Sequence, residues 1–520
     1  MDAHWVDTLV DFLSVPVARK ITMLQVKQSV TSSVVTTTTT SSSTREEIPS
    51  EPVARPAVHA LLSRMRRHHQ PAPAETAHVT RQWLQLATAL PNLHELDLGL
   101  IKVSTIEWLH AVPRLKKLSL DAAELPDLSL APLGKLSSLE SLYIQNYMTP
   151  NAQEIAKLGQ LKTLWINECA VLHNLSALGQ LHRLEMLTLT HLSAVEDLTF
   201  IKELTALRKL KVSFVGQEPA WLRLPELRTL SSTEAQSGDD QEATLGLPRL
   251  KSATFQRLRL RNLNFLALCP NLRRLALNTH EITTIDMLAA VPELRELKLS
   301  IDTVHGGKLP LSPLQSLSKL LHLELVTIRG RLQSNTLPVI PSLKTLSVPA
   351  VDDFEPLCHH FSSLSSLTVR DCSQVDVDYA PVFAGLPMLS KLALTFPIAT
   401  GRSESSAARP LDLSPLQELR QLRNLSLIHS NMENLSPLSE LVNLETLDLS
   451  AFYSTHLLAA SIADFAPLKR LENLKALSVA GRSDFDESDL EMLRKSENLK
   501  NLQRINTTEL VIPMLNSVIW

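Results

Sequence analysis

A leucine spacing that recurs about every 22 residues constrains the fold of this chain more than any other feature. The stretch 422–449 reads LRNLSLIHSNMENLSPLSELVNLETLDL, and the same leucine triplet opens at Leu422 and again at Leu444. Leu425 and Leu427 are two residues apart, which places both side chains on one face of a β-strand. After this strand the apolar step becomes three residues, which is the spacing of a short 3₁₀ helix. Each repeat therefore predicts one strand followed by one tight helical turn.

The strand pattern Leu-x-x-Leu-x-Leu, or a close apolar variant, opens 17 times along the 520 residues. The openings are the leucines at 93, 115, 139, 161, 184, 207, 227, 250, 272, 294, 320, 343, 364, 389, 422, 444 and 474, with a degraded eighteenth at Leu499. In a repeat array each unit packs only on its neighbours, so a chain of this length does not need several globular domains. The pattern predicts one parallel sheet of about 17–18 strands.

The repeats divide the chain into five segments. Residues 1–30 have the pattern of one amphipathic helix. Residues 31–52 are a Ser/Thr-rich tract that buries too little apolar surface to offset its ordering entropy, which predicts a disordered linker. Residues 53–90 are alanine-rich and predict a helical N-terminal cap, and the repeat array fills 91–499. Residues 500–520 are expected to cap the open end, because an uncapped repeat exposes both core and strand edge.

Composition indicates an intracellular protein. The formal net charge is −3, which gives no reason to expect nucleic acid. The four cysteines form no Cys-x-x-Cys pair, which is typical of a reducing compartment. The N-terminus lacks the basic region of a secretory signal, and no apolar run has the length of a membrane span. We expect a monomer in the cytoplasm, without membrane contact. The nucleus is the alternative, because Arg64, Arg66 and Arg67 form a small basic cluster.

The sequence contains no recognised catalytic motif: it has no phosphate-binding P-loop, no Gly-x-Ser-x-Gly and no His-Glu-x-x-His. Asp484, Asp486 and Asp489 have the spacing of a calcium loop, but Asp489 stands where such a loop needs glycine. His359 and His360 follow a cysteine, yet no further ligand stands at zinc spacing. The sequence therefore predicts no enzymatic activity, no cofactor and no metal site.

The repeat units resemble the leucine-rich repeat superfamily over about residues 91–500. Their 22-residue form is similar to the short-repeat class known from an intracellular regulatory subunit of protein phosphatase 1 and from bacterial internalins. The stretches 167–189 and 370–377 are also similar to leucine-rich repeat proteins of protozoa, some of which are described as adenylate-cyclase regulators. The resemblance implies an α/β, right-handed solenoid or horseshoe. A parallel sheet would line its concave face, and short 3₁₀ or helical segments its convex face.

One departure from the family pattern concerns the slot three residues after the last strand leucine. In the family this slot usually holds asparagine, or sometimes cysteine, whose side chain bonds the backbone of neighbouring turns. Here only Cys169 and Cys372 match, and many other slots are apolar, as at Tyr147 and Leu192. We expect apolar packing to replace the usual asparagine ladder. The two cysteines then have a structural role rather than a redox or metal role.

Strand phase identifies candidate binding residues. Within each strand the residues between the leucines point outward onto the concave sheet. Tyr143, Trp165 and Met186 are expected to form a row across three neighbouring strands, and Lys209 and Lys211 follow on the next strand. Aromatic residues are only 4% of the chain and are enriched at interface hot spots. The alternative is that N-terminal helices fold back over this row.

These observations favour a non-enzymatic scaffold or regulator that binds another protein on the concave face. The alternative is a dedicated regulatory subunit of an enzyme such as a phosphatase or an adenylate cyclase, which the family resemblance implies. A third hypothesis, an enzyme with an unrecognised site in the insertions, needs a pocket with convergent polar groups.

Overall fold

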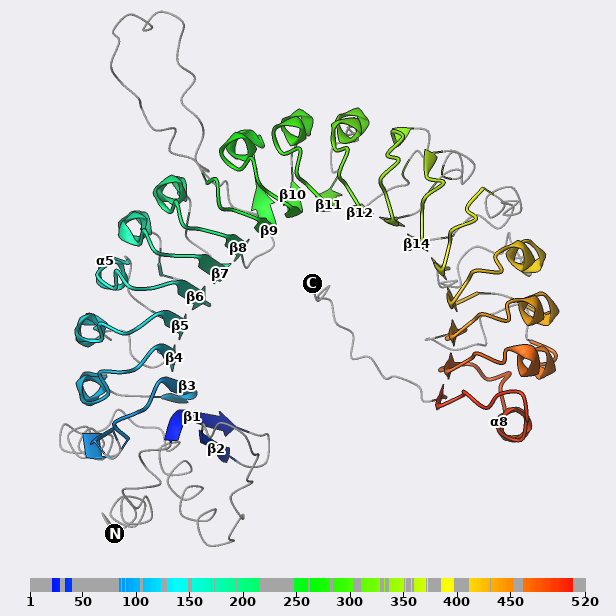
Figure 1. Cartoon of the computed structure of the whole chain (residues 1–520), viewed down its shortest axis with the longest axis horizontal. Coiled ribbons are helices and arrows are strands. Elements are labelled where there is room, and N and C mark those ends of the chain that lie inside the picture. Colours follow the sequence, from blue (N-terminus) through cyan, green and yellow to red (C-terminus); the bar gives the residue numbers. More distant parts are fainter. Residues whose placement is uncertain are drawn as a thin grey trace, which may run out of the picture. The chain divides into compact units, whose positions relative to one another are not determined.

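The computed structural model describes residues 21–28, 33–39 and most of 84–507, with gaps in the connecting segments. The longest gaps are 215–246, 303–309, 373–384, 397–410 and 452–461. The chain divides into two compact units, Met1–Ile282 and Thr283–Trp520, and each is described by itself. In both units the described strands lie on one side and the described helical turns on the other (Figure 1). We call these two sides the strand face and the turn face.

The first unit carries a ladder of parallel strands. Its members are β3 (Glu95–Lys102), β4 (Lys117–Asp121), β5 (Ser141–Gln145), β6 (Thr163–Asn167), β7 (Met186–Leu192), β8 (Lys209–Phe214), β9 (Ser252–Arg259) and β10 (Arg274–His280). Each strand pairs in parallel with the next. The register places leucine beside leucine, as in the pairs Leu118–Leu142 and Leu142–Leu164. The apolar rows of successive repeats therefore stack directly on one another.

The second unit continues the same pattern. Its strands are β11 (Glu296–Asp302), β12 (His322–Thr327), β13 (Thr345–Val348), β14 (Ser366–Val369), β15 (Lys391–Thr395), β16 (Asn424–Ile428), β17 (Thr446–Asp448), β18 (Ala476–Ser478) and β19 (Arg504–Asn506). All of its neighbouring pairs are parallel. The prediction of a parallel repeat sheet of about 17–18 strands is confirmed, because β3–β19 are 17 strands in the part of the chain that is described.

Short helical turns form the turn face. The 3₁₀ turns are η1 (Glu107–Ala111), η2 (Ala131–Lys135), η3 (Ser176–Gln180), η4 (Thr199–Glu203), η5 (Asn264–Leu268), η6 (Asp286–Ala290), η7 (Ser312–Ser316), η9 (Ser414–Glu418), η10 (Ser436–Glu440) and η12 (Ala466–Arg470). The α-helices α5 (Gln153–Ala156) and α8 (Glu487–Arg494) stand in the same place in their repeats. In η10 and the residues directly after it, the amides of Leu438, Leu441 and Leu444 each donate to the carbonyl three residues earlier, at 2.9, 3.0 and 2.9 Å. This is the bonding predicted from the three-residue apolar step.

The N-terminal prediction is wrong where the structure describes this region. Ile21–Gln28 (β1), within the predicted helix of residues 1–30, is a strand. Ser33–Thr39 (β2), within the predicted disordered linker of residues 31–52, is a strand that pairs antiparallel with β1. β1 also pairs in parallel with β3. Valine and threonine favour extended backbone, and the first repeat has an open edge whose amides and carbonyls need partners. The hairpin supplies these partners.

The repeat predicted at Leu227 is also corrected. β8 pairs directly with β9, and the amides of Lys251 and Ser252 donate to the Arg208 carbonyl at 2.9 and 3.2 Å. A strand between β8 and β9 is excluded by this pairing, because one strand edge bonds only one neighbour. Leu227 itself lies in 215–246, outside the described residues.

The C-terminal boundary shifts as well. β19 pairs in parallel with β18, through Leu477 and Ile505, so the array extends past residue 499 into the predicted cap at 500–520. The amides and carbonyls on the outer edge of β18 need hydrogen-bond partners. The degraded repeat at Leu499 supplies a strand that provides them. The predicted helical cap at 53–90 falls almost entirely outside the described residues, apart from a few helical positions between 84 and 88.

The slot three residues after the last strand leucine holds buried side chains, as expected. Tyr147 and Leu192 are buried, and the Cys169 sulfur accepts from the Tyr147 amide at 3.2 Å and donates to the Asn167 carbonyl at 3.3 Å. Burial raises the pKa of the Cys169 thiol to about 11 and that of Cys269 to about 12, so both thiols stay protonated at neutral pH. The prediction of apolar packing with a structural Cys169 is confirmed.

Leu438 tests the register of the turn face. Its side chain is 0% exposed. Replacing Leu438 by alanine should destabilise the second unit by about 2–5 kcal/mol, because a buried leucine leaves a cavity. Val442→Ala in the same repeat is the matched control, since Val442 is 48% exposed; it should change stability by about 0.5 kcal/mol or less. Urea unfolding with local fluorescence probes measures both, and equal effects would contradict the assigned register.

Candidate protein-binding surface on the strand face

The strand register places the predicted residues in two separate rows. Tyr143 of β5 stands beside Trp165 of β6, and this row continues through Thr188 of β7 to Lys211 of β8. Met186 belongs to the second row, beside Thr163 and Lys209. The predicted row of Tyr143, Trp165 and Met186 is therefore wrong in one member. Met186 stands two residues after its strand-opening leucine, whereas both aromatic residues stand four after theirs.

Trp165 is an exposed side chain with a fixed orientation. It keeps 41% of its surface exposed, between Leu164 and Ile166, which are both buried. Its indole Nε1 donates to Thr190 Oγ1 at 3.0 Å, and the Thr190 hydroxyl donates to Asn167 Oδ1 at 2.7 Å. His191 Nδ1 lies 2.9 Å from the same Asn167 oxygen. This chain of hydrogen bonds restrains the indole, although much of the side chain stays exposed to solvent.

Tyr143 supports the indole from the neighbouring strand. The two ring centroids are 5.7 Å apart with an interplanar angle of 87°, an edge-to-face contact of the kind worth about 0.5–1.5 kcal/mol. Lys117 Nζ of β4 lies 5.8 Å from the Tyr143 ring centroid. With Thr190 of β7, four neighbouring strands, β4–β7, therefore contribute to one ordered cluster. We call Lys117, Tyr143, Trp165 and Thr190 the aromatic patch.

Two members of this patch were not among the predicted site residues. Lys117 occupies an outward strand position, so its place on the strand face follows from the repeat. Thr190 lies beyond the strand leucines, where the backbone at His191 turns to a positive φ of 54°. Strand phase does not say which side chain bonds the Thr190 hydroxyl, so the bond from Trp165 to Thr190 is visible only in the structure.

The lysines at the other end of the two rows give the surface a basic margin. Lys209 is exposed and Lys211 is half-buried. They stand on β8, two strands beyond the aromatic pair on β5 and β6. The strand face thus changes from aromatic to cationic over four strands.

The acidic residues considered as a calcium site have other partners. The Asp486 carboxylate caps α8, accepting from the Ser488 hydroxyl at 2.6 Å and from the Asp489 amide at 3.0 Å. Asp484 pairs with the buried Arg482 through two hydrogen bonds of 2.8 and 2.6 Å. Within the described residues no group of three or more potential ligands gathers around one point. His360 is half-buried against Phe361, and His359 lies outside the described residues.

The two ladders of parallel strands, with tight turns between strands and a leucine repeat beneath them, have the architecture of a leucine-rich repeat fold. No family model matches the sequence, and no curated protein matches it. Among the described residues, no helix combines the length and apolar character that crossing a membrane requires.

A comparison with solved structures finds chains that are similar to this one. One is a leucine-rich repeat protein of Leptospira interrogans, with 17% identity, a TM-score of 0.47, and coverage of 81% of this chain and 91% of that chain. An internalin of Listeria monocytogenes has 16% identity and a TM-score of 0.29, over 84% of this chain and 89% of that one. A second Listeria internalin has 23% identity and a TM-score of 0.26, over 44% and 76%.

The cap on α8 gives a pH prediction. Hydrogen bonds from the Ser488 hydroxyl and the Asp489 amide lower the pKa of Asp486 below its ordinary value. A depressed carboxylate pKa stabilises the folded state above the ordinary pKa, and this contribution is lost as pH falls through the depressed value. Amide protection of Glu487–Arg494, corrected for intrinsic exchange, should therefore fall at acidic pH.

Two variants separate the cap from its charge. Asp486→Asn keeps a side-chain acceptor, so it should retain most of the protection and lose its acid dependence. Asp486→Ala should lower the protection at every pH. Hydrogen exchange followed by mass spectrometry measures both, and an unchanged acid dependence in Asp486→Asn would contradict the assignment.

Proposed function

We propose that this protein is a non-enzymatic scaffold or regulator that binds another protein through the strand face of its first unit. One observation carries the proposal: Trp165 is exposed and yet held in one orientation. Large exposed aromatic side chains contribute little to an isolated solenoid, whereas tryptophan and tyrosine are enriched among the residues that dominate binding energy. A side chain that is already ordered also loses less entropy when a partner binds.

The surroundings of Trp165 support the same proposal. Its neighbours in the row are Tyr143 and Thr188, and lysines lie two strands further along. An aromatic centre with a charged margin is the usual anatomy of a protein interface. The β1–β2 hairpin extends the sheet beside β3, so it adds a strand to the face. This placement argues against the alternative that the N-terminal segment around β1 and β2 covers the aromatic patch.

The first test compares the wild-type protein with Trp165→Ala in affinity purification and mass spectrometry. Truncating a central tryptophan costs about 2 kcal/mol or more of binding free energy, which corresponds to about a 30-fold weaker Kd. We expect the recovered partners to be lost from Trp165→Ala, while its stability falls by about 1 kcal/mol or less. Titration of the purified partner then measures the change in Kd.

Two controls sharpen this test. Met388→Ala removes a 63% exposed side chain from the second unit and should leave binding unchanged. Trp165→Phe keeps an aromatic ring without the indole N–H and should retain part of the affinity. One stoichiometric enzyme among the partners would favour a dedicated regulatory subunit, and several partners would favour a scaffold. A large loss of stability with affinity retained in Trp165→Ala would contradict the proposed surface.

A further inference from the structure

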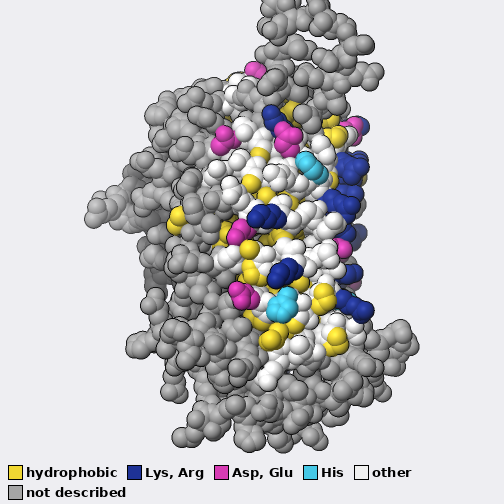
Figure 2. All heavy atoms as spheres, turned by 90° about the vertical axis from the view of Figure 1, so that its left-hand side faces the viewer, with side chains coloured by type: hydrophobic (Ala, Val, Ile, Leu, Met, Phe, Trp, Pro, Cys, Tyr) yellow, Lys and Arg dark blue, Asp and Glu magenta, His cyan; other side chains and the backbone are white. Residues whose placement is uncertain are grey.

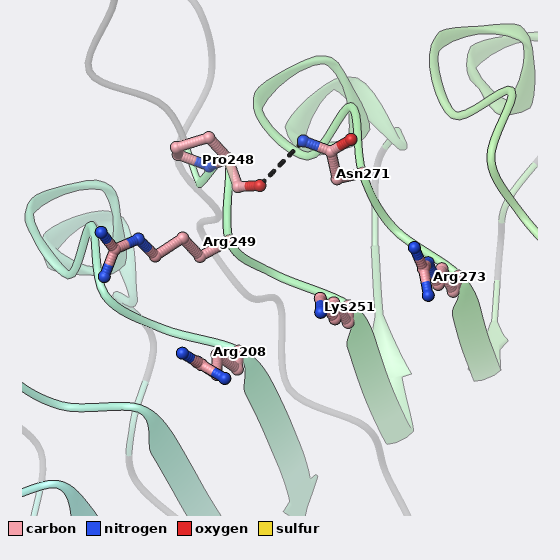
Figure 3. A pocket seen from close by; sticks show the side chains of 6 residues that line it. All are labelled: Arg208, Pro248, Arg249, Lys251, Asn271 and Arg273. Carbon is pink, nitrogen blue, oxygen red and sulfur yellow. Dashed lines mark hydrogen bonds between the residues drawn. The ribbon is translucent and has the colours of Figure 1, made fainter.

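A basic hollow lies at the edge of the first unit's sheet, where the chain enters the strands. It has a volume of about 300 Å³ and is lined by Arg208, Pro248, Arg249, Lys251, Asn271 and Arg273 (Figure 3). Arg208, Lys251 and Arg273 each stand immediately before a strand, β8, β9 and β10 respectively. We call this site, with its four cationic residues Arg208, Arg249, Lys251 and Arg273, the basic hollow. It is separate from the aromatic patch and was not identified from the sequence.

Backbone pairing brings these cations together. The Lys251 amide donates to the Arg208 carbonyl at 2.9 Å, and the Arg273 amide donates to the Lys251 carbonyl at 3.0 Å. Adjacent rungs of a sheet are about 4.8 Å apart, so the three side chains start from neighbouring positions. Arg249 joins them from the turn before β9, and the rim is held by the bond from Asn271 Nδ2 to the Pro248 carbonyl at 2.9 Å. Figure 3 shows this bond beside the four cationic side chains.

Charge along this edge changes at the basic hollow. In the preceding repeats the residue immediately before each strand alternates between acidic and basic. This alternation gives the ion pairs Glu140–Lys162 at 2.9 Å and Glu185–Arg208 at 3.3 Å. No carboxylate among the described residues pairs with Arg249, Lys251 or Arg273. Figure 2 shows Lys and Arg side chains gathered along one margin of the face it displays. Like charges at rung spacing repel, so this cluster favours an anion that neutralises it.

The chemistry of the lining selects the kind of anion. Arginine forks bind phosphate and carboxylate oxygens in pairs, and a phosphate carries more charge and more acceptor oxygens than a carboxylate. None of the described lining residues is aromatic, so these residues offer no ring on which a nucleobase could stack, which argues against single-stranded nucleic acid. Its volume is at the lower end of the range for small-molecule sites. We propose that the basic hollow binds a small soluble ligand that carries two or more clustered phosphate groups.

Calorimetric titration of the full chain with tripolyphosphate tests the proposal. We expect saturable binding that weakens as salt rises from about 50 to about 200 mM. Citrate should bind at least about tenfold more weakly, because carboxylates carry less charge per group. Lys251→Glu and Arg273→Glu should each weaken tripolyphosphate binding by at least about tenfold. Their melting temperatures should match the wild type, because both side chains are exposed.

Lys344→Glu is the matched control. Lys344 is an exposed lysine immediately before β13, the same edge position, but its neighbouring rungs are Leu321 and Ser365. This variant makes the same charge change outside a cluster and should alter affinity by less than about twofold. Trp165→Ala should leave tripolyphosphate binding unchanged, which separates this site from the proposed protein-binding surface. If a glutamate variant does not fold, Lys251→Gln and Arg249→Gln replace it.

Four results would overturn the proposal. They are the absence of saturable binding, an equal loss of affinity in Lys344→Glu and Lys251→Glu, equal affinity for citrate and tripolyphosphate, and binding confined to a macromolecular probe. For the last, a doubly phosphorylated peptide and a single-stranded RNA are titrated at the same salt concentration. Tight binding of either without binding of tripolyphosphate would identify a docking surface instead of a small-ligand site.

Discussion

In-register pairing of parallel strands is the constraint on which the described structure depends. Each strand satisfies its amides and carbonyls only through its two neighbours, so a residue at one repeat position always lies beside the same position of the next repeat. Rows of like positions result. The inward rows, such as Leu142 beside Leu164, form the core. The outward row contains Tyr143 and Trp165, and the edge row contains Lys251 and Arg273. One backbone pattern thus generates the core and both candidate surfaces.

The core and the outward phase were predictable because they depend on spacing alone. Leu438 is buried and Trp165 is exposed, as their places in the repeat require. The place of Met186 was equally present in the sequence. Repeats align from the strand-opening leucine, and counting from Leu184 assigns Met186 to the row of Thr163 rather than to that of Trp165. The prediction for Met186 was therefore wrong because its position within the repeat was miscounted, although the sequence contained the information needed.

Other features depend on competition between segments, which a local pattern does not contain. The leucines after Leu227 have the spacing of a strand, yet β8 bonds β9 instead. The Val/Thr run Ser33–Thr39 is low in complexity, yet it forms a strand in a hairpin whose other strand pairs with β3. In both cases the decisive quantity is which strand occupies a given edge. The bond from Trp165 to Thr190 is similar, because it joins side chains of two neighbouring strands, β6 and β7, that are 25 residues apart in the chain.

The junction of β8 and β9 shows how such an array separates function from stability. β8 and β9 are consecutive rungs of the ladder although 37 residues separate them in the sequence, and the backbone bonds across the junction keep ordinary lengths of 2.9 and 3.2 Å. The core leucines on both sides remain buried. The residues that change are those of the edge row, where Arg208 becomes the neighbour of Lys251. Since outward and edge side chains contribute little to the core, a repeat array tolerates new side chains there at small cost in stability. Clusters such as the aromatic patch and the basic hollow can therefore differ in chemistry while the ladder beneath them stays the same.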